Sequence, residues 1–299
     1  MTLHRLYTMT HMATTQQAQT AVCYRHPKNE TAVACSNCGR PICTECMVFA
    51  AVGIKCPECA GQPTGLKRTT TRKRTSTAFG TAGLVTRGLM GISIVVFLLQ
   101  IAQAGDINGR AGEIWVRGSL VGSFVADGEW WRLVTSAFIH ASPIHLLFNM
   151  VMLWWFGSAL ETLLGRVRYL GIVLVSILGG AAGALLATQA HELTVGASGA
   201  VFGILGAGLV LERRQIMVFG GGAFAVVALN LALSFLIPGI SIGGHLGGLA
   251  AGAAATLALS RFGRGHAAYG RLGLVGAGGL LAVAVLSIAV AYFRVRGYA

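Results

Sequence analysis

The sequence predicts an all-α protein that crosses a membrane several times and carries a small cysteine-rich module before its first span. Two observations lead to this fold class. The mean hydropathy of +0.67, with 54% hydrophobic and only 11% charged residues, exceeds what a soluble globular surface needs. All seven cysteines fall within residues 23–59, outside the long apolar runs. We therefore expect two regions of different chemistry in one chain.

Seven apolar runs account for the high hydropathy. Most of them reach the roughly 17–25 residues that a helix needs to cross a bilayer, so we expect seven membrane segments. The runs are 88–104, 146–164, 169–188, 199–211, 216–237, 242–259 and 272–293.

The distribution of basic residues predicts the orientation of these segments. Lys and Arg gather in alternate loops, whereas the short loops 189–197 and 238–244 contain neither. This is the positive-inside pattern, which places the N-terminus in the cytoplasm and, after seven spans, the C-terminus outside the cell membrane. The basic run 67–74 precedes the first span, where it would meet anionic lipid. We therefore expect no nucleic-acid partner despite a net charge of +13.

Two further segments are assigned by composition. Residues 1–20 are polar and rich in Thr and Gln, which favours disorder, and they lack the apolar segment of a signal peptide. Met12 is an alternative start. Residues 63–83 are rich in Gly, Thr, Lys and Arg and are expected to form a basic linker.

The cysteine-rich module, residues 21–62, has the spacing of a metal site. Four pairs of soft ligands, each separated by two residues, suffice for two tetrahedral zinc ions. The pairs are Cys23 and His26, Cys35 and Cys38, Cys43 and Cys46, and Cys56 and Cys59. A disulfide knot is the alternative, but a cytoplasmic location disfavours disulfides, and a histidine completes the odd cysteine count. The ions would be structural and would supply folding energy to a module with a small core.

The same pattern resembles the B-box type of zinc finger. The cross-braced arrangement of that family implies that the first pair shares one ion with the third, and the second pair shares one with the fourth. Cys23, His26, Cys43 and Cys46 would then hold one ion, and Cys35, Cys38, Cys56 and Cys59 the other. Such a module would bind or regulate, with a cytoplasmic protein as a possible partner.

Within the membrane part, four polar side chains are expected at one depth. Ser198 stands at a turn before a segment of about 13 residues, which spans only roughly 20 Å of a hydrocarbon core near 30 Å. His145 and Asn149 share one face of the second span because they are four residues apart, and His245 opens the sixth. The second, fourth and sixth spans run in the same direction, so these side chains share a leaflet. Intramembrane polar groups are more often functional than mere packing.

This set has the composition of a serine-protease site. Ser198 needs a base to become a nucleophile, and His245 is the available one. Asn149, His145 and the Ser198 backbone N–H could stabilise an oxyanion. None of the ten acidic residues lies in the fifth or sixth span, which favours a Ser–His dyad over a triad. The chain contains no His-Glu-x-x-His motif and no pair of membrane aspartates, which argues against metalloprotease and aspartyl mechanisms.

Together these residues resemble the rhomboid family of intramembrane serine proteases. Residues 84–260 would form its six-helix core, and residues 261–299 a seventh helix and tail. The resemblance implies that Ser198 is the nucleophile, His245 the base, and His145 and Asn149 the oxyanion donors. The remaining motif residues would shape the first loop or let helices approach; they are Trp131, Arg132, Gly196, Gly199, Gly248 and Gly252. Phe202 stands where the family often has a tyrosine packed on the catalytic histidine.

The resemblance also implies substrates. The family cuts single-pass membrane proteins in or near their transmembrane segment, with water entering from outside and the substrate passing the fifth span. No catalytic cofactor is expected. Two alternatives stay open: a catalytically inactive rhomboid-like protein that binds membrane clients, and a zinc-finger adaptor that the spans merely anchor.

Overall fold

A computed structural model describes residues 21–49, 53–61, 83–214, 216–261 and 273–298. The chain divides into two compact units, residues 1–76 and residues 77–299. The segment 1–20, the basic run 67–74 and nearly all of the expected linker lie outside the described residues. The two units are described separately below.

The first unit consists of two short hairpins and two short helical turns around a core of sulfur-bearing side chains. Its elements are β1 (Ala21–Val22) paired antiparallel with β2 (Glu30–Thr31), η1 (Thr44–Cys46), β3 (Val48–Phe49) paired antiparallel with β4 (Ile54–Lys55), and α1 (Pro57–Gly61). Ile42 is the one fully buried aliphatic side chain among the described residues of this core, and cysteines make up the rest of its buried members. So small an apolar core leaves the unit dependent on what the cysteines bind.

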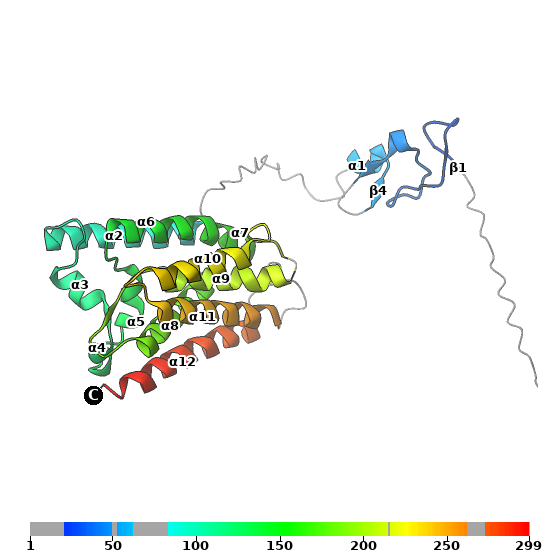
Figure 1. The fold of residues 1–299 in the computed structure, drawn as a ribbon. Coiled ribbons are helices and arrows are strands. Elements are labelled where there is room, and N and C mark those ends of the chain that lie inside the picture. Colours follow the sequence, from blue (N-terminus) through cyan, green and yellow to red (C-terminus); the bar gives the residue numbers. More distant parts are fainter. Residues whose placement is uncertain (1–20, 50–52, 62–82, 215, 262–272, 299) are drawn as a thin grey trace, which may run out of the picture. The chain divides into compact units, whose positions relative to one another are not determined.

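The second unit is a bundle of helices (Figure 1). In chain order its elements are α2 (Leu84–Ala104), α3 (Gly112–Gly118), β5 (Leu120–Val121), α4 (Gly122–Ala126), α5 (Arg132–Thr135), η2 (Ser136–Phe138), α6 (Pro143–Met152), η3 (Leu153–Gly157), α7 (Ser158–Leu164), α8 (Arg166–Ala187), β6 (Leu193–Thr194), α9 (Ser198–Arg213), α10 (Ala223–Leu236), α11 (Ile242–Arg261) and α12 (Leu274–Val295). Helices α8, α9 and α11 pack on one another at its centre, and α12 runs beside α8 and α11.

The helical membrane architecture expected from the sequence is confirmed. Among the described residues, five helices are long and apolar enough to cross a membrane; they are 84–104, 143–164, 166–187, 242–260 and 274–295. The fourth expected segment is α9, whose 16 residues span roughly 24 Å.

The extent expected for the fifth segment, residues 216–237, is wrong. Helix α10 begins only at Ala223 and has 14 residues. Gly220 and Gly221 adopt positive φ angles of 69° and 85°, which interrupt a helix. The carboxylate of Glu212 accepts hydrogen bonds from the backbone N–H groups of Phe219, Gly221 and Ala223, so it caps the start of α10 from the end of α9.

The central helices touch through their backbones. A Cβ atom added to Gly252 of α11 would overlap the carbonyl oxygen of Gly203 on α9, and one added to Gly248 would overlap that of Gly199. On the other side of α11, a Cβ atom at Gly247 would overlap the carbonyl oxygen of Gly179 on α8. Glycine faces of this kind let membrane helices approach until their backbones are in contact.

A buried carboxylate fixes the start of α2. Glu161 of α7 is 4% exposed, and it accepts hydrogen bonds from the backbone N–H groups of Val85 and Thr86 and from the Thr86 hydroxyl. These donors stand at the N-terminus of α2, where a helix has unpaired N–H groups and favours negative charge. The bonds join the first span to the second.

The C-terminal end of α12 is hydrogen-bonded to the C-terminal end of α8. The guanidinium of Arg294 donates to the carbonyl oxygens of Leu185 and Thr188, at 3.1 Å each, and the Tyr298 hydroxyl donates to Thr188 O at 2.8 Å. These carbonyls lie at the C-terminus of α8, directly before the loop that leads to Ser198, so Arg294 and Tyr298 cap that helix. The seventh helix is therefore part of the bundle and supports the approach to the candidate site.

The glycine contact between α9 and α11 is tested by one methyl group. Gly252→Ala should lower the free energy of unfolding by about 1–3 kcal/mol, because the added carbon has no space. Gly278→Ala in α12 is the matched control, since nothing lies within 4 Å of its added carbon. Thermal unfolding of both variants in the same detergent measures the difference, and equal midpoints would contradict the close contact.

Candidate active site and metal-binding clusters

Ser198 is the first residue of α9, and the loop before it is held at two points. Strand β6 pairs antiparallel with β5, with Leu120 opposite Thr194. The backbone N–H of Gly196 donates to the carbonyl oxygen of Ser136 at 2.9 Å. Both anchors lie in the stretch between α2 and α6, so the elements of that stretch position the serine.

His145 lies against this loop. An added Cβ at Gly196 would stand 2.6 Å from Cε1 and 2.7 Å from Nε2 of His145, and Gly196 also has a φ of 120°, which disfavours other residues. The backbone N–H of Ala141 donates to His145 Nδ1 at 3.4 Å. Because Nδ1 then acts as acceptor, a neutral His145 carries its hydrogen on Nε2, next to the loop that leads to Ser198.

Asn149 lies one turn further along the same helix. Its side chain is buried, and one N–H of its amide donates to the His145 carbonyl oxygen at 2.9 Å. The second N–H of the amide is left for another acceptor. Ser142 caps the start of this helix by accepting the His145 backbone N–H, and Pro143 occupies its first position, so the sequence defines the start of the helix that carries both donors.

His245 lies in the first turn of α11 and is 6% exposed. Its ring stacks on Phe202, with centroids 4.0 Å apart and an angle of 17° between the planes. Phe202 follows Ser198 by one turn of α9, so both occupy the same face of that helix. Nδ1 of His245 lies 2.6 Å from the hydroxyl oxygen of Ser234 on α10. In the described part of the chain no hydrogen bond joins Ser198 to His245.

The glycine contacts set the distance between the two helices at this depth. Gly199 directly follows Ser198 and packs against Gly248, which lies one turn after His245. Gly203 and Gly252 repeat the contact one turn further. The four glycines named from the sequence thus lie where α9 and α11 meet or, for Gly196, where the loop meets His145.

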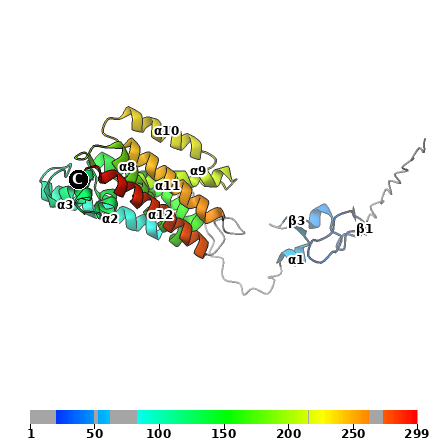
Figure 2. The ribbon, with the colours of Figure 1, turned by 90° about the horizontal axis from the view of Figure 1, so that it is seen from below.

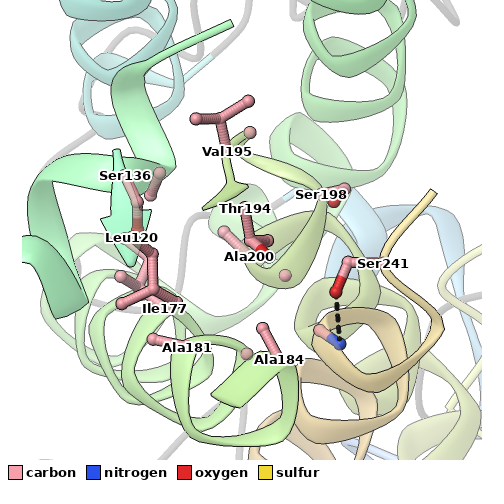
Figure 3. Close-up of a pocket in the computed structure, with 15 residues that line it drawn as sticks. Leu120, Ser136, Ile177, Ala181, Ala184, Thr194, Val195, Ser198, Ala200 and Ser241 are labelled. Atoms are coloured by element: carbon pink, nitrogen blue, oxygen red, sulfur yellow. Dashed lines mark hydrogen bonds between the residues drawn. The ribbon is translucent and has the colours of Figure 1, made fainter. Parts of the chain in front are cut away.

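A small cavity adjoins Ser198. The side chains of Ser136, Thr194, Ser198 and Ser241 lie around it, as Figure 3 shows, together with backbone atoms of Gly199 and the small residues of α8. It offers about 30 Å³ to the centres of water molecules. One ordered water needs roughly 10–15 Å³ on this measure and two or more polar partners, so the cavity has space and partners for water beside the serine hydroxyl.

Trp131 and Arg132 do not line the cavity beside Ser198. Arg132 is 2% exposed, and its guanidinium donates to the carbonyl oxygens of Val116 and Ser119, at 2.6 Å each, and to Glu129. Trp131 is half-exposed and donates from Nε1 to the Arg117 carbonyl oxygen. Arg132 holds together α3, β5 and α5, and β5 in turn pairs with the loop before Ser198.

Sequence reasoning did not identify Ser234 or Ser136. A serine in an apolar helix is a signal, because polar groups inside a membrane are costly. Nothing in the local pattern, however, indicates that Ser234 meets His245, or that Ser136 accepts from Gly196.

The eight soft ligands of the first unit gather into two groups. One contains Cys23, His26, Cys43 and Cys46, and the other contains Cys35, Cys38, Cys56 and Cys59. Within each group, one ligand atom per residue lies within 4.8 Å of all the others, and the seven cysteines are free thiols. This is the grouping that a cross-braced zinc finger implies.

The distances within the groups fit a tetrahedral metal. Zn–S bonds of about 2.3 Å place neighbouring sulfurs roughly 3.8 Å apart, and Cys38 Sγ lies 3.8 Å from Cys56 Sγ. His26 Nδ1 lies 3.2 Å from Cys43 Sγ and 3.4 Å from Cys46 Sγ. Four protein ligands close each site, as in structural zinc sites.

A polar contact connects the two groups. The Tyr24 hydroxyl, between Cys23 and His26, donates to Glu58, which lies between Cys56 and Cys59. This hydrogen bond, together with a smaller contribution from the hydrogen bond of Arg25, holds the pKa of Glu58 below its usual range. The two candidate metal sites are thereby joined through side chains as well as through the chain itself.

Comparisons with known proteins agree with the fold. Residues 127–262 match the family model described as Rhomboid domain. The chain is 33% identical over 174 residues to rhomboid protease GluP of Bacillus subtilis, covering 57% of this chain and 34% of that protein. It is 38% identical over 132 residues to putative rhomboid protease YdcA of the same organism, covering 43% and 66%. Rhomboid protease AarA of Providencia stuartii is 27% identical over 204 residues, covering 58% and 72%.

The aligned regions span about a third of the GluP relative and just under two thirds of the YdcA relative. The family match itself, residues 127–262, lies within the second unit.

Loss of a ligand should remove metal from the first unit. We expect about two zinc ions per chain in the purified protein and about one in Cys43→Ser, because that variant loses a ligand of a single four-ligand site. Thr44→Ser is the matched control and should keep both ions. Elemental analysis of the three proteins measures the ratio, and a metal-free wild type with disulfide-bonded cysteines would contradict the assignment.

Proposed function

The membrane unit of this chain carries a rhomboid domain, and on that premise we propose that it is an intramembrane serine endopeptidase that cuts the transmembrane segments of membrane proteins. Ser198 is the proposed nucleophile and His245 the proposed general base. The observation that supports this most is the stacking of His245 on Phe202, which brings the imidazole to the face of α9 that begins with Ser198. Ser198 lies one turn before Phe202 on α9, so the proposed base stacks next to the turn that carries the proposed nucleophile.

The proposed reaction is an acyl transfer through an acyl-enzyme intermediate. Nε2 of His245 takes the Ser198 hydroxyl proton as Oγ attacks the scissile carbonyl carbon. The resulting oxyanion accepts hydrogen bonds from His145 Nε2–H, from the free amide N–H of Asn149 and from the Ser198 backbone N–H. His245 then returns the proton to the leaving amine, and a water molecule hydrolyses the acyl-enzyme by the same steps.

The cavity beside Ser198 supports the second half of this reaction. Hydrolysis of an acyl-enzyme needs water at a site that lies among apolar helices. The cavity has room for a water molecule, and its largely apolar lining includes Ser136, Thr194, Ser198 and Ser241. Its walls come from α8, from the start of α9 and α11, and from β5, η2 and the loop before Ser198. Water would therefore reach the serine from the end of the bundle where that loop lies.

The remaining assignments follow from the sequence patterns. We propose that the protein is a multi-pass protein of the cell membrane, with its N-terminus in the cytoplasm and its C-terminus outside, and that its substrates are transmembrane proteins. The two metal sites would hold structural zinc and take no part in catalysis. The first unit would regulate or target the enzyme by binding a cytoplasmic protein.

One observation is compatible with a second candidate, a catalytically inactive protein that binds membrane clients. The described residues contain no direct hydrogen bond between Ser198 and His245. Active serine enzymes often show longer catalytic distances without substrate, so this feature keeps the alternative in view without favouring it over catalysis.

The nucleophile is tested by covalent labelling. A fluorophosphonate probe should label the wild type and Ser260→Ala, whose serine lies at the far end of α11, and should not label Ser198→Ala. Cleavage of a model transmembrane substrate in vesicles should fall by roughly a thousandfold or more in Ser198→Ala. Equal labelling of all three proteins would overturn the protease assignment in favour of the inactive alternative.

Removal of the first unit separates an enzyme from an anchored adaptor. Deletion of residues 1–80 should leave kcat for a model transmembrane substrate in vesicles unchanged, because the units are compact separately and the catalytic residues all lie in the second. Full loss of cleavage by a deletion variant that still unfolds cooperatively would show that the first unit takes a direct part in the reaction.

A further inference from the structure

Ser234 is an unusual residue for its helix. Most side chains of α10 face outward, and only Ala223, Val227 and Ser234 are buried among its described residues. Figure 2 shows α10 at the margin of the bundle. Ser234 is nevertheless 2% exposed, and its hydroxyl oxygen lies 2.6 Å from Nδ1 of His245. The single buried polar group of this helix thus meets the proposed catalytic base.

The direction of this hydrogen bond follows from counting hydrogens. The Ser234 oxygen also lies 2.7 Å from the carbonyl oxygen of Asn230, one turn earlier in α10. A carbonyl oxygen can only accept, and a hydroxyl has one hydrogen to donate. When that hydrogen lies on the bond to Asn230, the Ser234 oxygen presents a lone pair to His245. Nδ1 must then carry a hydrogen and donate it.

A neutral imidazole has one N–H, so a hydrogen on Nδ1 leaves the lone pair on Nε2. Only this tautomer can take a proton through Nε2 from Ser198. We propose that Ser234 is a positioning residue that holds His245 in the Nδ1–H tautomer and fixes its ring against Phe202. This inference rests on the proposed function, because it assigns Ser234 the orienting role that a carboxylate has in a Ser–His–Asp triad.

Proton transfer through His245 leaves this bond intact. The Ser198 O–H bond breaks, a bond forms between Nε2 and that proton, and the Ser198 oxygen bonds to the substrate carbonyl carbon. Nδ1 keeps its hydrogen on Ser234 throughout, and Ser234 keeps its own on Asn230. When Nε2 gives its proton to the leaving amine, His245 returns to the starting tautomer. No proton leaves through Ser234, so the step balances with the residues present.

The arrangement also ties the base to a third helix. His245 lies on α11 and Ser198 on α9, whereas Ser234 lies on α10. The described residues place no carboxylate in contact with His245 that could replace the hydroxyl. The tautomer therefore depends on α10 lying in its place beside α11.

Kinetics of three variants in vesicles test the role. Ser234→Ala should lower kcat for a fluorogenic transmembrane peptide by roughly tenfold to a hundredfold with KM unchanged, since general-base catalysis is weakened and not removed. Ser234→Thr keeps the hydroxyl and should recover most of that loss. Ser287→Ala is the matched control, because Ser287 is a buried serine of α12 that likewise donates to a carbonyl one turn earlier, at 2.9 Å.

A spectroscopic measurement reads the tautomer directly and does not need turnover. In the full chain labelled with ¹⁵N-histidine, the His245 signals, identified by their loss in His245→Ala, should report Nδ1–H in the wild type and in Ser234→Thr. Ser234→Ala should show a mixture of tautomers. The tautomer of His245 in the wild type is measured independently of whether a fluorophosphonate labels Ser198. Failure of this inference is therefore distinguishable from failure of the proposed function.

Three outcomes would overturn the inference. One is a wild-type kcat in Ser234→Ala, and another is an Nε2–H tautomer in the wild type. The third is an equal loss of kcat in Ser234→Ala and Ser234→Thr, because the site would then need a side chain of serine's size and not its hydroxyl.

Discussion

The contact between the backbones of α8, α9 and α11 is the constraint on which the rest of the membrane unit depends. Helices that bury only apolar surface gain little from leaving lipid, so their association relies on close packing. Gly199 against Gly248 and Gly203 against Gly252 bring α9 and α11 together at the depth of Ser198 and His245. A larger side chain at any of these positions would separate Ser198, the proposed nucleophile, from His245, its proposed base, even though the glycines have no proposed part in the chemistry.

A second constraint acts on the loop before Ser198. Arg132 gathers the short elements between α2 and α6 through three hydrogen-bonding partners, and β5 of that stretch pairs with β6 of the loop. From the other side, Arg294 and Tyr298 hold the end of α8, where the loop begins. The loop is thereby fixed at both ends by groups that lie outside the site, which leaves Gly196 free to pack against His145.

Two kinds of buried polar group occur in the membrane bundle, a charged carboxylate with hydrogen-bond donors around it and a neutral hydroxyl. Glu161 is a buried carboxylate whose charge is met by three donors at the start of α2, as burial of a charge among apolar helices requires. Beside His245 there is a hydroxyl in place of a carboxylate, and a hydroxyl costs far less to bury. In its proposed role, Ser234 directs the imidazole without a second charge, which suits a proposed base that alternates between neutral and cationic forms within a membrane helix bundle.

Much of this protein follows from local pattern, and the rest from packing. Spacing alone identified the eight candidate metal ligands, and hydropathy predicted where most of the long helices occur, because both depend on residues that are near in sequence. The start of α10 at Ala223 was not predictable, since it depends on a cap from Glu212 and on the φ angles of Gly220 and Gly221. The sequence by itself also singled out Ser198, His245, His145 and Asn149, which it predicts to lie at one depth. Only the tertiary structure decided that His245 stacks on Phe202 and bonds to Ser234, because hydrogen bonds between separate helices depend on how those helices are rotated and how closely their glycines let them approach.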